Sequence, residues 1–384
     1  MFTCGGTAGH VNPALALARR IREDNQDARF LFVGADRGLE RDLIMKAGYD
    51  FKAVHISSFH RSFQPKEIRH NFISIINLMR SPGEARAILR EFQPDVVIGT
   101  GGYASYPAVK AAHKAGIPTA VHESNMIPGL ATKLLEPYAD RIMTGFEAAR
   151  NGYKNPDKVV ITGTPVRGDF FVKTKQEAKR ELNLDLNKPF IVSFWGSLGA
   201  SGMNRVMADF IALESVKTPF YHYHAAGKDG FPMILNLLRE KNIDININNN
   251  KNNNINNINN IIINQDINIL EYIYNMSVVM RAADLVISRA GASTLSELTA
   301  LGVPAILVPS PFVTNHHQEK NAKALEDAGG AVVLSEQDCT GALLFQTAAK
   351  ITRDVNQLNH MSQSMAALGV PDATERILET IYNL

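Results

Sequence analysis

The chain has 384 residues, of which 45% are hydrophobic and 20% charged, and its formal net charge is +2 at pH 7. This composition is typical of a globular protein, and the near balance of charge gives no case for nucleic acid as a main partner. The two cysteines, Cys4 and Cys339, lack metal-ligand spacing and fit a reducing compartment. No apolar run approaches the ~18 residues of a membrane span, and no signal-peptide pattern is present. We therefore expect a cytosolic protein, or one on the cytosolic face of a membrane.

Short apolar runs alternate with helical patterns in the first half of the chain. The opening residues 2–10 form an apolar stub and a glycine-rich turn that leads into an amphipathic helix. Further strands are predicted at 29–33, 95–98, 117–121, 141–143 and 159–161, with helices near 39–47 and from about 107. Strands that alternate with helices indicate βαβ units and a parallel sheet.

The glycine-rich turn carries the first candidate chemistry. Glycines allow a close backbone approach to a ligand, and the following helix start suits a phosphate. His10 lies in this turn and could move a proton. The alternative is a tight strand-to-helix connection without a ligand. Gly5, Gly6 and Gly9 do not match the dinucleotide fingerprint, which disfavours a nicotinamide enzyme.

The second half repeats the same design. Strands are predicted at 190–194, 220–224, 284–288 and 303–308, with a second glycine turn at 196–202. The fold class predicted is therefore α/β, with two doubly wound domains joined near 162–167 and ligands beyond the carboxyl ends of the strands. We expect one domain over 1–163, a second over 164–366, and a C-terminal helix over 367–384 that packs back on the first.

Residues 243–269 consist almost entirely of isoleucine and asparagine. We interpret this low-complexity segment as having neither helical nor clean strand periodicity. We expect a surface-loop insertion without a catalytic role, and its isoleucines favour self-association.

Residues 284–297 form a second strand, turn and helix start. The helix near Ser293 could hold a diphosphate, and Glu297 could accept hydrogen bonds from a ribose diol. The alternative is that Thr294 and Glu297 form a capping box. Further along, Gln318 and Asn321 could reach sugar hydroxyls. The adjacent histidines there do not share a helix face, which disfavours zinc.

Two shorter polar motifs complete the pattern. Residues 122–125 follow a strand and are interpreted as a ligand-contact loop rather than a metal site. Arg167 places a cation near the expected domain junction, although a plain surface arginine is the alternative.

Taken together, these motifs resemble glycosyltransferase family 28, the GT-B N-acetylglucosaminyltransferases of peptidoglycan synthesis. The resemblance implies two doubly wound Rossmann-like domains that face a cleft. It runs in family order over nearly the whole chain, apart from the Ile/Asn segment. The matching stretches are 5–10, 99–103, 122–125, 164–167, 196–200, 289–297, Gln318 with Asn321, and 371–376.

The resemblance implies an inverting transfer of N-acetylglucosamine from UDP-N-acetylglucosamine to the C4 hydroxyl of a muramyl sugar. That sugar is carried by undecaprenyl pyrophosphate in the acceptor lipid I. His10 is the candidate catalytic base, expected neutral at a helix N-terminus, and Glu123 is the alternative base or orienting partner. No metal or other cofactor is expected, because a helix dipole and Arg167 can stabilise the leaving UDP.

The family also implies binding roles for particular residues. The turn that contains Ala8 would face the acceptor diphosphate, as would Gly101 and Gly102. Glu297 would hold the ribose, and Ile273 would lie against uracil through its backbone. The remaining contacts implied are Thr7, Gly9, Asn125 and Gln318 at N-acetylglucosamine, Arg167 at the diphosphate, and Ser197, Ala292, Ser293, Thr294, Leu295 and Ser296 around the diphosphate and uridine.

The lipid acceptor requires a membrane contact. Residues 59–63 and 68–80 combine apolar side chains with basic ones, which predicts docking on an anionic membrane surface. The alternative is a helix that faces the protein core. The resemblance places the protein at the cytoplasmic face of the plasma membrane, with other wall-synthesis and division proteins as further partners.

Three features depart from the family pattern. The first strand is short, Trp195 stands where the family has a glycine beside the donor pocket, and the Ile/Asn segment precedes Ile273. Two alternative functions therefore remain open here. One is a GT-B enzyme acting on another lipid such as diacylglycerol, and the other is a catalytically impaired scaffold that binds a sugar nucleotide.

Overall fold

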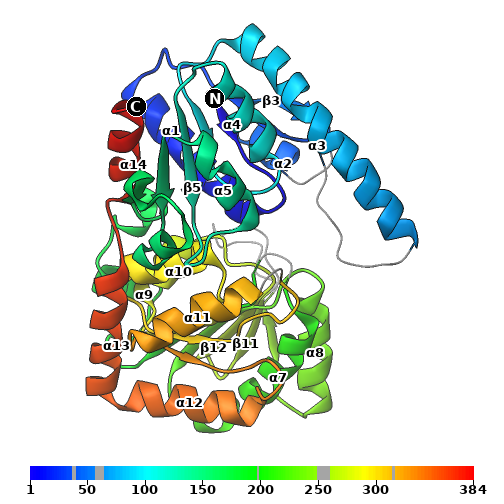
Figure 1. Ribbon diagram of the computed structural model, residues 1–384. Coiled ribbons are helices and arrows are strands. Elements are labelled where there is room, and N and C mark those ends of the chain that lie inside the picture. Colours follow the sequence, from blue (N-terminus) through cyan, green and yellow to red (C-terminus); the bar gives the residue numbers. More distant parts are fainter. Residues whose placement is uncertain (37–39, 57–64, 197–198, 249–259, 314–315) are drawn as a thin grey trace. The chain divides into compact units, whose positions relative to one another are not determined.

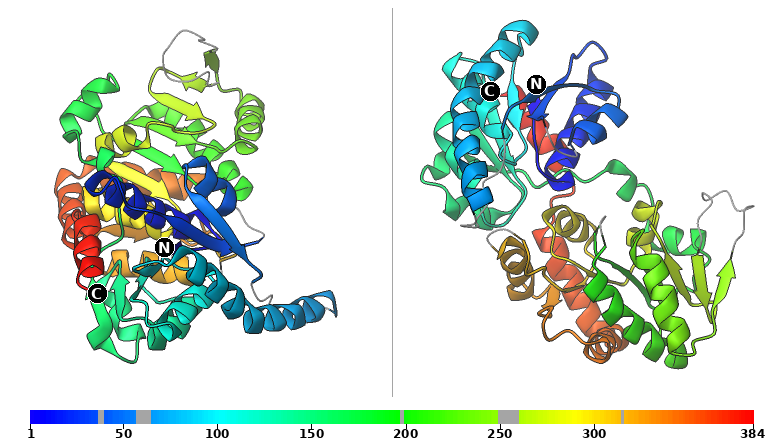
Figure 2. Two further views of the ribbon diagram at one scale, coloured as in Figure 1. Left: turned by 90° about the horizontal axis from the view of Figure 1, so that it is seen from above. Right: turned by 90° about the vertical axis from the view of Figure 1, so that its right-hand side faces the viewer.

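The computed structural model describes residues 1–36, 40–56, 65–196, 199–248, 260–313 and 316–384. The chain divides into two compact units (Figure 1). The first unit contains Met1–Val166 and Val370–Leu384, and the second contains Arg167–Gly369. Figure 2 shows helices along both faces of the sheet in each unit, as the alternating sequence pattern predicts.

The first unit is built on a parallel sheet with the strand order β3-β2-β1-β4-β5-β6-β7. Its strands are β1 Phe2–Thr3, β2 Leu31–Ala35, β3 Asp50–Val54, β4 Val97–Gly99, β5 Thr119–Glu123, β6 Arg141–Thr144 and β7 Val159–Ile161. Its helices are α1 Ala8–Asp24, α2 Glu40–Lys46, α3 Pro65–Phe92, α4 Ser105–Lys114, α5 Leu130–Leu135 and α14 Ala373–Tyr382, with 3-10 turns at Glu136–Tyr138, Glu147–Gly152 and Pro156–Lys158.

The short first strand lies at the centre of this sheet. Phe2 pairs in parallel register with Phe32 of β2 on one side and with Ile98 of β4 on the other. Phe2 is fully buried and stacks on Phe32 with 5.3 Å between ring centroids. The turn that follows β1 is therefore anchored on both sides, although the strand has only two residues.

The C-terminal helix α14 packs against α1 within the first unit (Figure 1). Its buried residues Ile377, Leu378 and Ile381 join the same hydrophobic cluster as Val11 and Leu17. The last helix thereby supports the helix that carries His10.

The second unit has an eight-stranded sheet with the order β10-β11-β12-β9-β8-β13-β14-β15. Its strands are β8 Phe190–Phe194, β9 Tyr221–Ala225, β10 Asn246–Asn248, β11 Asn260–Ile263, β12 Ile267–Leu270, β13 Leu285–Ser288, β14 Ala305–Leu307 and β15 Ala331–Val333. Its helices are α6 Lys175–Glu181, α7 Ser201–Lys217, α8 Gly230–Glu240, α9 Met276–Ala282, α10 Ala292–Leu301, α11 His317–Asp327, α12 Gly341–Arg353 and α13 Val355–Leu368, with a 3-10 turn at Gly168–Phe170.

The Ile/Asn segment is part of the second sheet, so the expectation of a surface loop is wrong for its described residues. Strand β12 pairs in parallel with β9, and β11 and β10 continue the sheet in antiparallel pairing. Ile261, Ile263, Ile267 and Ile269 are buried in the main core of the unit. Isoleucine at every second position gives one apolar face, which is the period-two pattern of a strand.

Among the described residues, no helix combines the length and the apolar character that crossing a membrane requires. Residues 59–63 lie outside the described part of the chain, as do most side chains of 68–79. The proposed membrane contact therefore stays a prediction.

Candidate functional site

Three loops of the first unit meet at the carboxyl ends of β1, β4 and β5, which are neighbours in the sheet. The Gly5 N–H donates to the Gly101 carbonyl oxygen over 3.3 Å. A Cβ on Gly102 would collide with the Gly5 carbonyl, and Gly102 has a φ of +80°. Only glycine permits this approach of the two turns.

His10 lies in the first turn of α1, and its ring is fixed by these glycine turns. Its Nδ1 is 2.8 Å from the Gly5 carbonyl oxygen. A carbonyl only accepts, so this bond assigns the ring proton to Nδ1 and leaves the lone pair on Nε2. A Cβ on Gly101 would lie 2.7 Å from the ring carbon Cδ2, so the ring packs directly against that glycine. Nε2 is therefore the ring nitrogen of His10 that can take a proton.

The other residues of this turn lie at the start of α1. Thr7 is the N-cap and is exposed, and its side chain makes no capping bond; its hydroxyl lies 3.4 Å from His10 Nδ1. Ala8 and Gly9 are the first two helical residues. Since Thr7 does not cap the helix with its side chain, the first turn of α1 suits an anion.

Glu123 is buried, and its carboxylate organises the loop after β5. One oxygen accepts from the backbone and side-chain amides of Asn125, both at 2.9 Å. The other accepts from the Gly129 N–H at 2.7 Å and the Thr132 hydroxyl at 2.6 Å. With four donors on it, this carboxylate is better placed to hold Asn125 than to take a substrate proton. The geometry favours His10 over Glu123 as base.

Both ring nitrogens of His122 also have polar neighbours within the first unit. Its Nε2 lies 2.9 Å from the Gly163 carbonyl oxygen, and the Ser124 hydroxyl lies 3.4 Å from its Nδ1. Complete burial lowers the pKa of this imidazole. His122 therefore supports the loop from below, and Asn125 is the member of this motif that is half-exposed.

In the second unit, α10 begins directly after β13 and the turn at Gly291. Gly291 is the N-cap and has no side chain with which to cap the helix. The capping-box alternative for Thr294 and Glu297 is wrong, because the N-cap is Gly291, three residues before Thr294. Ser293 Oγ is buried and finds no hydrogen-bond partner in the described part of the chain. The N–H groups of the first turn and this hydroxyl can donate hydrogen bonds to a bound anion.

The other residues at the start of α10 differ in burial. Leu295 is fully buried, and the Ser296 hydroxyl donates to the Ala292 carbonyl over 3.0 Å. Ala292 and Thr294 are half-exposed at the first turn. A ligand can therefore reach the first turn through Ala292, Ser293 and Thr294, while Leu295 fixes the helix to the core.

Glu297 lies one turn further into α10 and is half-exposed. Desolvation raises the pKa of its carboxyl to about 7, while the positive charge of Arg167 lowers it and Asp169 raises it. Arg167 itself is exposed, lies 3.2 Å from the Asp169 carboxylate and covers the Phe170 ring at 5.4 Å. The structure thus places Arg167 and Glu297 within electrostatic reach of each other.

The remaining candidates of the second unit differ in accessibility. Gln318 accepts the Ser310 N–H over 2.9 Å and is half-exposed. Ile273 follows β12 and is only 2% exposed, so its side chain belongs to the core and the backbone contact with uracil stays a prediction. Ser197 lies outside the described residues. Trp195 is buried in the main core beside Arg289, whose guanidinium carbon lies 5.9 Å from the ring centroid.

Two residues near these turns were missed by the sequence reasoning. Arg289 is largely buried, pairs with Glu336 at 2.8 Å and donates to the Val308 carbonyl at 2.9 Å, so it fixes the turn before α10. Glu40 is fully buried behind the first glycine turn. A lone acidic residue at a helix start gives no signal of burial in sequence, because such residues usually stay exposed there.

Comparison with protein-family models identifies both units. Residues 1–144 match the glycosyltransferase family 28 N-terminal domain, and residues 190–377 match the glycosyltransferase family 28 C-terminal domain. The chain belongs to glycosyltransferase family 28. It is a glycosyltransferase with the GT-B fold of two Rossmann-like domains.

Curated members of family 28 match the chain from end to end. One from Acetivibrio thermocellus is 37% identical over 380 residues, which cover 99% of this chain and 96% of that one. One from Bacillus cytotoxicus is 38% identical over 381 residues, covering 99% and 97%. Both are named UDP-N-acetylglucosamine–N-acetylmuramyl-(pentapeptide) pyrophosphoryl-undecaprenol N-acetylglucosamine transferase.

Solved structures confirm the fold of this family 28 chain. MurG from Acinetobacter baumannii matches with a TM-score of 0.75 and 24% identity, over 100% of this chain and 99% of that one. The UDP-GlcNAc 2-epimerase of Neisseria meningitidis matches with a TM-score of 0.60 and 14% identity, over 100% and 99%. At these identities the likeness concerns the fold alone.

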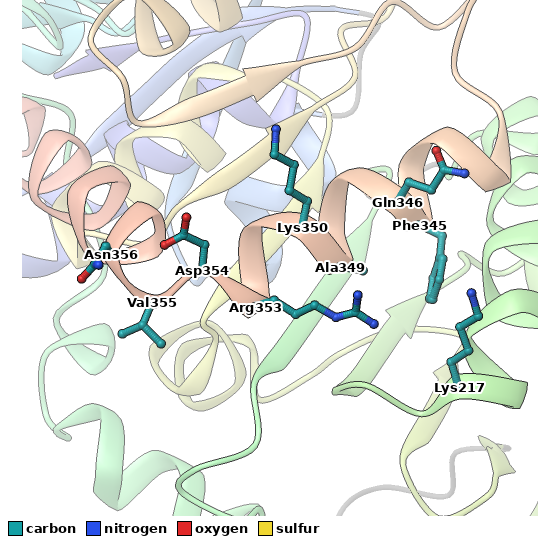
Figure 3. Close-up of a pocket in the computed structure, with 9 residues that line it drawn as sticks. All are labelled: Lys217, Phe345, Gln346, Ala349, Lys350, Arg353, Asp354, Val355 and Asn356. Atoms are coloured by element: carbon teal, nitrogen blue, oxygen red, sulfur yellow. The ribbon is translucent and has the colours of Figure 1, made fainter.

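The second unit also has a surface hollow of about 720 Å³ (Figure 3). It is lined by Lys217, Lys350 and Arg353 around the ends of α7 and α12. Lys217 precedes β9, so the hollow lies at the amino end of that strand, whereas α10 starts from the carboxyl end of β13. In the described part of the chain, no three His, Cys, Asp or Glu side chains are grouped so that they could hold a metal ion.

Proposed function

We propose that this glycosyltransferase transfers N-acetylglucosamine from UDP-N-acetylglucosamine, with inversion, to the C4 hydroxyl of the muramyl sugar in undecaprenyl-linked lipid I. The names of relatives at 37% and 38% identity state this donor sugar and this lipid-linked acceptor. The observation that carries the chemistry is the His10 imidazole, whose Nδ1 is held by the Gly5 carbonyl while Nε2 keeps a lone pair.

The donor is proposed to bind at the start of α10. The uncapped first turn and the buried Ser293 hydroxyl suit the diphosphate, and Glu297 suits the ribose diol. Arg167 adds a cation whose charge already acts on Glu297. These groups would stabilise the negative charge that grows on UDP as it leaves.

The acceptor side of the reaction is assigned to the first unit. His10 Nε2 takes the proton from the C4 hydroxyl as that oxygen forms a bond to the anomeric carbon. The bond between the anomeric carbon and the UDP oxygen breaks on the opposite face, and its electron pair leaves with UDP. A single displacement of this kind inverts the configuration. Asn125, held by Glu123, and Thr7 and Gly9 of the opening turn are proposed to contact the transferred sugar.

A polyprenyl-linked acceptor implies a peripheral position on an anionic membrane at the cytoplasmic face. The sequence of residues 68–80 supports this, because apolar residues there are bordered by basic ones. Liposome sedimentation of an Ile75→Glu/Met79→Glu variant tests it. Loss of binding to anionic vesicles is expected, and binding equal to that of the unchanged protein would remove the assignment.

An acceptor panel tests the proposed specificity. UDP-N-acetylglucosamine is supplied with a short-chain lipid I analogue or with diacylglycerol, and sugar transfer is measured by mass spectrometry. We expect transfer to the lipid I analogue alone. Transfer to diacylglycerol would show a different lipid glycosyltransferase, and nucleotide binding without transfer to either acceptor would show a scaffold.

A further inference from the structure

Glu40 is a fully buried carboxylate that joins two structural elements behind the opening turn. It is the first residue of α2, and one of its oxygens accepts the Ala35 N–H at the end of β2 over 3.2 Å. The other oxygen faces the Gly6 N–H at 3.4 Å. A buried carboxylate is costly unless donors satisfy it, so its place here calls for a role.

The Gly6 N–H and the Gly5 C=O belong to the same peptide group. Glu40 accepts from the N–H end of this group, and His10 Nδ1 donates to its C=O end over 2.8 Å. The three groups therefore form one chain, from carboxylate through peptide to imidazole. Hydrogen bonds in such a chain polarise one another, so the charge on Glu40 strengthens the Gly5 oxygen as an acceptor.

The peptide group in the middle of this chain is held tightly. A Cβ on Gly5 would lie 2.7 Å from the Cβ of Ala104 and 3.0 Å from Glu40 Oε1. Gly6 has a φ of +90°, a conformation that favours glycine. The orientation of the Gly5 carbonyl, and hence of the imidazole that it receives, thus depends on a backbone that Glu40 touches directly.

Two neighbouring side chains also experience the charge of Glu40. Burial and the Glu40 carboxylate raise the pKa of the Cys4 thiol to about 12. Burial, Glu40 and Asp36 raise the pKa of the Tyr103 hydroxyl. Both groups therefore stay protonated at neutral pH, and neither adds a second negative charge behind the turn.

The geometry points to Glu40 as a positioning residue for His10, acting through the Gly5–Gly6 peptide group. It fixes the imidazole with its proton on Nδ1 and favours the imidazolium that forms when Nε2 takes the acceptor proton. In a Ser-His-Asp triad a carboxylate does this by direct contact with the imidazole. The inference rests on the proposed role of His10 as the base.

The test compares Glu40→Gln with Glu136→Gln in the full chain. Glu136 is the matched control, since it is a buried carboxylate of the same unit that accepts a backbone N–H, from Asn155 at 2.6 Å. Nitrogen-15 NMR of the histidine rings measures the tautomer of His10, which His10→Ala identifies in the spectrum. Steady-state transfer to a short-chain lipid I analogue gives kcat and KM, and calorimetry gives UDP-N-acetylglucosamine affinity.

Glu40→Gln is expected to lower kcat roughly 10- to 100-fold, the range found when the hydrogen-bonded partner of a metal-binding histidine is removed. The donor affinity should stay the same, and the share of His10 with its proton on Nδ1 should fall. Glu136→Gln should lose stability without changing kcat or the tautomer. An unchanged tautomer in Glu40→Gln, with a kcat loss no larger than in Glu136→Gln, would overturn the inference.

Glu40→Asp keeps the charge but shortens the reach, and it serves where Glu40→Gln does not fold. We expect Glu40→Asp to lower both kcat and the share of His10 with its proton on Nδ1, without abolishing either. Wild-type values for both would overturn the inference. Full activity of His10→Ala would instead refute the base role proposed for His10, whereas the NMR result still reports whether Glu40 orients the ring.

Discussion

The Nδ1 atom of His10 lies 2.8 Å from the carbonyl oxygen of Gly5. This one bond decides which ring nitrogen can take a proton, because the carbonyl can only accept. It also connects the short central strand β1 to the chemistry, since Gly5 follows that strand by two residues.

Replacing His10 by alanine should lower turnover roughly 10²- to 10⁴-fold, because a positioned general base contributes that much to a rate. Binding of UDP-N-acetylglucosamine should persist, since the groups proposed to hold its UDP part lie in the second unit. Steady-state kinetics and calorimetry on the same preparation measure both. Turnover close to that of the unchanged protein, with binding intact, would exclude His10 as the base.

Donor affinity should depend on pH through Glu297, whose raised pKa is about 7. Ribose hydroxyls donate, so the ionised carboxylate is the form that binds them. Affinity for UDP-N-acetylglucosamine should therefore increase as the pH rises from 6 to 8, and Glu297→Gln should bind weakly with little pH dependence. Calorimetry at the two pH values measures this. A wild-type affinity that is the same at both would contradict the role of Glu297.

The free protein should become more stable when Glu297 is replaced by glutamine. The folded state holds a proton on Glu297 up to about pH 7, whereas the unfolded carboxyl loses it near 4.5. Stability is therefore lost as the pH rises through this window. At pH 8 the variant should gain on the order of 1 kcal/mol, discounted for partial exposure, and the gain should vanish toward pH 5.

Thermal unfolding at pH 5 and pH 8 measures this gain. Glu240→Gln, at an exposed position of α8, is the control and should leave Tm unchanged. An equal Tm for Glu297→Gln and the unchanged protein at pH 8 would show that ionising the partly desolvated Glu297 carboxyl carries no cost.

A buried polar network in the second unit should contribute strongly to its stability. Ser193 Oγ lies 2.7 Å from both His222 Nε2 and His224 Nδ1, and His222 Nδ1 lies 2.7 Å from a Glu214 oxygen. All four side chains are fully buried. Ser193→Ala should cost about 2–4 kcal/mol, because two buried imidazoles each lose a partner.

Urea unfolding measures the cost of Ser193→Ala. Ser215→Ala is the control, because that half-exposed hydroxyl donates to the Ala212 carbonyl of its own helix. A loss below 1 kcal/mol for Ser193→Ala would show that water replaces the missing hydroxyl.

The isoleucines of β12 should behave as core residues. Ile269→Ala is expected to reduce the free energy of unfolding by about 2–5 kcal/mol, the range for large-to-small changes in a core. Asn268, the half-exposed neighbour on the other face, should tolerate serine with little change. Chemical denaturation compares the two variants. Equal and small effects would return the segment to the surface-loop interpretation.

The strands that end in a turn were the easiest part of the fold to predict. Each predicted strand is observed within two residues of its expected bounds, because a short buried run followed by glycine is a strong local signal. β3, β15 and the strands of the Ile/Asn segment were missed. Isoleucine and asparagine alternate at 267–269, which is the period of two of a strand, but the runs of asparagine before it interrupt that pattern in the sequence.

Contacts between distant residues could not be predicted from the sequence. The Thr294–Glu297 spacing fits a capping box, but α10 starts at Ala292 because Gly291 ends the preceding turn. Glu40 is 34 residues from Gly6, and only the pairing of β1 with β2 brings them together. Spacing along the chain carries no record of such a contact.

Product analysis of the wild-type reaction tests the central claim most directly. UDP-N-acetylglucosamine and a short-chain lipid I analogue are incubated with the protein, and proton NMR determines the new linkage. We predict a single product in which N-acetylglucosamine is attached to C4 of the muramyl sugar in the inverted, β configuration. An α linkage, attachment at another hydroxyl, or release of UDP without a glycosylated acceptor would contradict the account.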